Sequence, residues 1–167
     1  MDYYQGVVIE YLRADRAIFV NTECCIQLKE APNPDQGEKH WYCDALAVDF
    51  RSQYIYLCEV TYSKDLGALV RRLASWNAHW PAVKASLVQD FCVPNDWPVR
   101  PWLFVPEACI TPAVKRIKAI RSGNENADVI PEPRITTLEA VAPWNYRSWN
   151  RQGESEKPLS IPEGMRK

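Results

Sequence analysis

The segment from Tyr42 to Lys64 has the pattern of a β-hairpin, and its second half carries an acid in an unexpected place. The residues YIYLCEV are almost continuously apolar, yet they include Glu59. An isolated charge in an apolar interior is very costly, so a carboxylate at this position requires a partner. The hairpin therefore constrains both the fold and the chemistry of the chain.

The first strand of the hairpin supplies a candidate partner. If Arg51-Ser52 is a two-residue turn, Phe50 pairs with Gln53, and counting back along both strands places Asp44 opposite Glu59. Residues opposed in this way have Cβ atoms about 5 Å apart. Two carboxylates at that distance repel each other unless a cation or a proton lies between them. A three-residue turn would instead place the two acids on opposite faces of the sheet.

A divalent metal is the cation that this arrangement favours. Glu10 lies at the margin of the apolar stripe of the first predicted helix, three residues after Val7, and can add a third carboxylate to Asp44 and Glu59. Carboxylate oxygens are the ligands that Mg²⁺ prefers, and Mn²⁺ suits the same set. Such an ion activates water and neutralises charge on phosphate, which predicts hydrolysis of a phosphodiester. Asp49 lies on the alternate face beside the turn, so we expect it to be solvated.

The rest of the chain predicts alternating helices and strands. The expected elements are a helix over 3–17, a strand over 18–28, a loop over 29–40, strands over 41–50 and 54–62, a helix over 65–91 that breaks at Pro81, a connection over 92–101, a strand over 102–105, and a helix that starts at Thr111-Pro112 and ends near Arg121. Residues 131–144 fit either an edge strand or a short helix. The order predicts an α/β domain over 1–149, with a mixed central sheet flanked by helices. Residues 150–167 lack periodicity and are expected to form a flexible C-terminal tail.

Composition excludes some classes of protein. The formal net charge is −1, so any surface for nucleic acid has to be local. Met1-Asp2 opens no signal-peptide pattern, and no apolar run is long enough for a membrane span. The six cysteines form no C-x-x-C pair, which favours free thiols over a zinc site. We therefore expect a cytoplasmic protein.

The hairpin acids and the order of elements together resemble the PD-(D/E)XK nuclease superfamily. That family has a restriction-endonuclease-like αβββαβ core, an Asp early in the second strand, Glu-x-Lys on the third, and often a Glu on the first helix. Here Asp44 matches the Asp, Glu59-Val60-Thr61 stands in the Glu-x-Lys place, and Glu10 matches the helix acid. The resemblance covers roughly residues 3–122, and it implies a Mg²⁺- or Mn²⁺-dependent endonuclease or exonuclease that acts on DNA.

The departure from the family lies at Thr61, where the catalytic lysine is expected. Lys64 is the nearest replacement, at the end of the strand, and Lys84 on the following helix is a second candidate. The alternative is that catalysis has been lost. The protein would then be an inactive nuclease-fold module that binds nucleic acid or a partner protein, or a subunit that cuts only within a larger assembly.

Several basic residues are candidates for contacts with DNA phosphates. They lie on two predicted helices, and a solvated helix face is the favoured alternative explanation: Arg71, Arg72, Lys115, Lys118 and Arg121. Trp144 and Trp149, near Tyr146 and Arg147, could form a patch for stacking bases or binding a protein. Nucleases of this size often pair to cut both strands, so a homodimer is also a candidate assembly.

Overall fold

The computed structural model describes residues 2–28, 40–123 and 128–146. Four α-helices, five strands and one 3-10 turn are found in these ranges. They are, in chain order, α1 (Tyr3–Arg13), β1 (Ile18–Gln27), β2 (His40–Asp49), β3 (Tyr54–Val60), α2 (Gly67–Ala78), α3 (Trp80–Phe91), β4 (Val99–Val105), η1 (Glu107–Cys109), α4 (Ile110–Ser122) and β5 (Arg134–Thr137).

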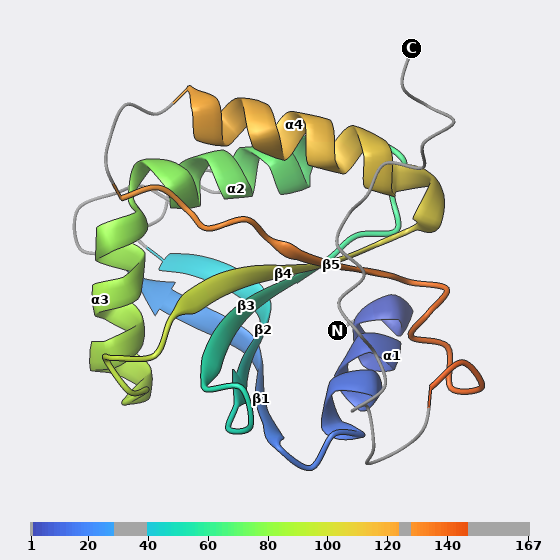
Figure 1. The fold of residues 1–167 in the computed structure, drawn as a ribbon, viewed down its shortest axis with the longest axis horizontal. Coiled ribbons are helices and arrows are strands. Elements are labelled where there is room, and N and C mark those ends of the chain that lie inside the picture. The colour runs from blue at the N-terminus through green and yellow to red at the C-terminus, as the bar shows by residue number, and fades with distance from the viewer. Residues whose placement is uncertain (1, 29–39, 124–127, 147–167) are drawn as a thin grey trace.

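The five strands form one mixed sheet in the order β1-β2-β3-β4-β5 (Figure 1). The first three pair antiparallel, while β3 with β4 and β4 with β5 pair parallel. Parallel neighbours need a crossover connection, and here α2 with α3 and then α4 provide it. The chain is therefore an α/β fold with a mixed sheet and helices on both faces, as the sequence predicts.

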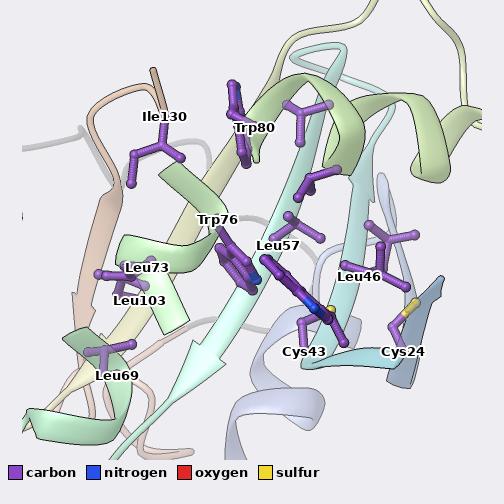
Figure 2. Packing of buried hydrophobic residues seen from close by; sticks show 14 of the residues in the cluster. Cys24, Cys43, Leu46, Leu57, Leu69, Leu73, Trp76, Trp80, Leu103 and Ile130 are labelled. Carbon is purple, nitrogen blue, oxygen red and sulfur yellow. The ribbon is translucent and has the colours of Figure 1, made fainter. Parts of the chain in front are cut away.

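Two apolar clusters pack on the two faces of this sheet. α1 covers one face with Val8, Tyr11 and Leu12, which are fully or almost fully buried. The helices α2, α3 and α4 cover the other face, where Trp76 and Leu73 pack over strand residues such as Leu57 and Leu103 (Figure 2). Because both faces are covered, β3 and β4 are buried over most of their length.

The expected helix break is confirmed, and some element boundaries differ from expectation. Pro81 lies in the first turn of α3, and the two helices meet at His79. The fourth helix does not begin at Thr111, because Cys109 takes the N-cap position without a side-chain hydrogen bond. The first helix ends at Arg13 because the carboxylate of Asp15 accepts a hydrogen bond from the Ala17 N–H and fixes a turn.

The hairpin has the expected register but a longer turn. Asp49 pairs with Tyr54, the same register that Phe50 with Gln53 would give, and the four residues between them form the turn. The expectation of a solvated Asp49 is wrong. Its side chain is buried and accepts hydrogen bonds from the N–H groups of Arg51 and Ser52 and from the Ser52 hydroxyl. The Asp49 carboxylate therefore stabilises the turn by binding two of its N–H groups and one hydroxyl.

The C-terminal region resolves one open alternative. Residues 134–137 form a strand, β5, rather than a helix. Most of the expected loop at 29–40, the expected tail at 150–167, and Trp149 lie outside the described residues. Within the described ranges, no helix is both long and apolar enough to cross a membrane.

Candidate functional site: two acids at the opening of strands β2 and β3

The candidate site lies where β2 and β3 separate. Their ladder ends at the pair Ala45–Cys58, one step before Asp44 and Glu59. Beyond this point β2 continues beside β1, and β3 continues beside β4. The Asp44 carboxylate bridges the opening, since its Oδ2 accepts a hydrogen bond of 2.7 Å from the Val60 N–H. The side chain thus replaces the main-chain contact that the separating strands lose.

Asp44 is held by neutral donors. Besides the Val60 N–H, the amide of Gln5 on α1 donates to Oδ1 at 2.6 Å. Burial raises the pKa of the Asp44 carboxyl, and these two hydrogen bonds with the charge of Arg72 oppose that rise. The charge of nearby Asp2 acts with burial. The protonated form of Asp44 is therefore favoured more than in an exposed aspartate.

Glu59 is held by a cation. Its side chain has no exposed surface, and the Arg72 guanidinium of α2 lies 2.9 Å from its carboxylate. The Arg72 side chain keeps 25% of its surface exposed, so the pair reaches from the core towards solvent. A buried carboxylate beside a guanidinium has its charge compensated within the fold.

The two acids turn towards different helices. Gln5 approaches Asp44 from α1, whereas Arg72 approaches Glu59 from α2, and these helices lie on opposite faces of the sheet (Figure 1). The side chains of β2 show why. Cys43 and Leu46 pack with the α2 cluster while Ala45 packs with the α1 cluster, so the regular alternation is broken at Asp44.

Glu10 lies apart from this pair. Its side chain is 70% exposed and its carboxylate contacts Arg13 at 3.4 Å on the outer side of α1. It lines a shallow groove with residues of α1 and Pro143. From the same helix, the structure brings Gln5 to Asp44 where the sequence suggested Glu10.

The candidate lysines also lie away from the acids. Lys64 is exposed in the connection between β3 and α2. Lys84 pairs with Asp128 at 2.8 Å. Thr61, in the place of the family lysine, accepts a hydrogen bond from the Ser63 N–H and helps the chain turn after β3. Arg72 is the cation that contacts Glu59.

Three exposed tyrosines border the opening. Tyr4 and Tyr62 stack with ring centroids 4.9 Å apart, and Tyr3 meets Tyr4 edge-on at 5.4 Å. Tyr4 precedes Gln5, and Tyr62 follows Val60 by two residues, so the stacked pair joins the two segments whose residues bind Asp44. Their exposure ranges from 40% for Tyr4 to 78% for Tyr3. We call Tyr3, Tyr4 and Tyr62 the tyrosine cluster.

The basic residues divide into two groups. Arg72 faces the buried Glu59, and the Arg121 guanidinium donates to the carbonyl of Ile130, so both have structural contacts. Arg71 on α2 and Lys115 and Lys118 on α4 are exposed. These two helices lie side by side (Figure 1).

The sequence analysis did not predict that Gln5 binds Asp44 or that Arg72 binds Glu59. Arg72 lies three residues after Leu69 and four before Trp76, which places it on the buried side of its helix. That spacing could have marked it as a partner for Glu59. Gln5 had a weaker signal, because it also completes the capping box with Asp2 that starts α1.

The donor set, as arranged, does not fit a divalent ion. Arg72 already compensates Glu59, Glu10 is on the outer side of α1, and within the described ranges no group of three or more His, Cys, Asp or Glu side chains is arranged to hold a metal. What the arrangement can do is exchange a proton at Asp44 and present aromatic rings beside it. Comparison with known proteins gives no match to a family model and none to a curated protein.

Proposed function

We propose that this chain is a DNA-binding module with a restriction-endonuclease-like αβββαβ core of the PD-(D/E)XK type, and that it does not cleave DNA by itself. The order of elements, the antiparallel β1-β2-β3 unit and the parallel β4 support that core. Asp44 and Glu59 then stand at the family's acid positions.

The contact between Arg72 and Glu59 carries the proposal. In a metal-dependent nuclease the acid on the third strand must face a metal ion, which needs an accessible carboxylate. Here the Glu59 side chain is fully buried and faces a guanidinium 2.9 Å away. Two groups that cleavage requires are therefore missing from this site: an accessible carboxylate on the third strand and the lysine that Thr61 replaces.

Two surfaces support DNA as the ligand. The tyrosine cluster offers exposed aromatic faces, and stacking of bases on such faces is worth about 1–3 kcal/mol per base. Arg71, Lys115 and Lys118 place positive charge on α2 and α4, where they can contact phosphates. A chain with a net charge of −1 would bind through such local surfaces.

Fluorescence anisotropy with labelled single-stranded and duplex oligonucleotides at two salt concentrations tests this proposal. We expect Tyr62→Ala to weaken binding to single strands by roughly 5- to 150-fold, as the loss of one stacked base implies. Phe19→Ala is the matched control, because Phe19 is also exposed, at 66%, but lies at the start of β1 beside Phe50. No binding by the wild type, or equal loss in both variants, would refute the proposal.

A metal-dependent nuclease is the second candidate, and the hairpin register favours it. Extended one step past its last pair, Ala45–Cys58, the register would bring Asp44 opposite Glu59, as in a nuclease of this family. Titration with Mn²⁺ by calorimetry, together with cleavage assays on linear, nicked and branched DNA, separates the two candidates. We expect neither metal binding nor cleavage. Mg²⁺-dependent cleavage that disappears in Asp44→Ala would establish the nuclease and contradict our proposal.

Two further expectations belong to the same proposal. A cytoplasmic location agrees with six free thiols. Pairing of two copies, or docking on a partner protein, stays a prediction that size-exclusion chromatography with light scattering would test.

A further inference from the structure

The edge of the sheet contains a pair of cysteines that the proposed function does not use. Cys24 on β1 lies directly opposite Cys43 on β2 in the ladder. Both residues are 2% exposed and belong to the same buried cluster, so their side chains project from the same face of the sheet (Figure 2). Two cysteines in this relation are candidates for a covalent link.

The register gives the pair a suitable geometry. Residues directly opposite in an antiparallel ladder have Cα atoms about 4.5–5.5 Å apart, which lies inside the range of about 4.4–6.8 Å found in disulfides. The Cys43 thiol donates to the Ala45 carbonyl at 3.4 Å, and the two thiols are close enough to shift each other's pKa.

The two thiols differ in pKa, and this difference decides which of them reacts first. The Cys43 thiol lowers the pKa of Cys24, while the interaction with Cys24, then burial and nearby charges, raise the pKa of Cys43 well above its ordinary value. Cys24 is therefore the better thiolate and the first nucleophile. Access to it requires local opening, and among the residues that the structure describes β1 is an edge strand that pairs only with β2.

We propose that Cys24 and Cys43 form a site of reversible disulfide formation across β1 and β2, with a small disulfide such as oxidised glutathione as the oxidant. The Cys24 thiolate attacks one sulfur of glutathione disulfide, the S–S bond breaks, and one glutathione thiolate leaves. The deprotonated Cys43 sulfur then attacks Cys24 and releases the second glutathione. Two protein thiols lose two protons and two electrons, and one glutathione disulfide becomes two glutathione thiols.

The consequence would reach the candidate site, because Cys43 immediately precedes Asp44. The disulfide would hold β1 against β2 beside the residue that bridges β2 and β3. A crosslink in the unfolded chain also removes conformational freedom, so the oxidised protein should unfold at a higher denaturant concentration. This inference does not depend on the proposed binding of DNA.

Peptide mapping of the folded full chain tests the site. After incubation with oxidised glutathione and alkylation of the remaining thiols, cleavage after Lys and Arg separates residues 17–29, which hold Cys24, from residues 40–51, which hold Cys43. We expect these peptides joined, two hydrogens lighter than their sum, and separated again by dithiothreitol.

Matched serine variants identify the partner. Residues 17–29 also hold Cys25, which is less buried and adjacent in sequence. We expect the joined peptides in Cys25→Ser and in Cys92→Ser, and a loss of at least about tenfold in Cys24→Ser, since only the opposed residue has the required geometry. Circular dichroism checks that each variant folds. Joined peptides that persist in folded Cys24→Ser, or none in the wild type, would overturn the inference.

Discussion

Asp44 and Glu59 differ in how the fold accommodates their charge, although both come directly after the last pair of the β2–β3 ladder. Glu59 faces α2, is completely buried and contacts a guanidinium. Asp44 faces α1, is half-buried and accepts hydrogen bonds from an amide and a main-chain N–H. One acid is balanced by an opposite charge, and the other by dipoles.

This difference indicates that Asp44 is the acid whose protonation the fold favours. Removing the arginine beside Glu59 leaves a carboxylate in the core without its cation. A carboxyl whose pKa is raised by burial can take up a proton without loss of its neighbours. Glu59 therefore forms a structural ion pair with Arg72, whereas Asp44 is the acid at the opening whose pKa burial raises.

The largest effect is expected at Arg72. Arg72→Leu leaves Glu59 buried without its cation and should reduce the free energy of unfolding by roughly 3–5 kcal/mol, near the lower end because the guanidinium is partly exposed. The double variant Glu59→Leu with Arg72→Leu should recover much of that loss. Urea denaturation of the three proteins measures both values. A double variant as unstable as Arg72→Leu would mean that the loss does not come from an uncompensated charge on Glu59.

A smaller loss is expected at Asp44. Asp44→Ala leaves the Val60 N–H without its acceptor at the strand opening, which costs about 1–3 kcal/mol. Gln5→Ala, which removes only one donor to the same carboxylate, is the control and should cost less. If both variants unfold at the wild-type urea midpoint, Asp44 does not hold the two strands.

The contribution of Asp44 to stability should decrease as the pH rises, the opposite of an aspartate whose pKa is lowered by folding. Because its pKa is raised in the folded protein, its contribution to stability is greatest below the ordinary value of 3.8 and is lost as the pH rises through the folded pKa. The stability of the wild type relative to Asp44→Asn should therefore increase as the pH falls from neutral towards that window. Urea midpoints of both proteins across this range provide the measurement. A difference that decreases on acidification would mean that hydrogen bonds and Arg72 outweigh burial.

The smallest effect is expected at Glu10. Glu10→Gln removes an exposed i,i+3 contact with Arg13 and should change the free energy of unfolding by less than about 0.5 kcal/mol. Binding of oligonucleotides in the anisotropy assay should also be unchanged. A large loss in either measurement would place Glu10 with the acid pair after all.

The sheet could be predicted from sequence because its signals are local. Alternating or continuous apolar runs marked the first three strands, and a proline in a helical pattern marked the junction of α2 and α3 at His79. The register of the hairpin was also correct, even though its turn has four residues, because Asp49 pairs with Tyr54 in the same alignment.

The site could be predicted only in part because it depends on contacts between distant segments. The acids Asp44 and Glu59 were found from one hairpin, but their partners come from α1 and α2. Strict alternation would have placed both acids on one face. It fails at Asp44 because the strands separate there and the carboxylate turns to bind the Val60 N–H. The separation of the strands leaves no pattern in the sequence, and the capping box at Gln5 marks the start of a helix rather than a contact with Asp44.

The change from antiparallel to parallel pairing at β3 has a consequence for the order of folding. β1, β2 and β3 are neighbours in the chain as well as in the sheet, so they can pair after closing short loops, while β4 must return across two helices before it meets β3. Contacts between residues far apart in sequence form more slowly. Because Arg72 arrives with α2, the meander is expected to form before the charge of Glu59 is compensated, and the docking of α2 would then complete the core.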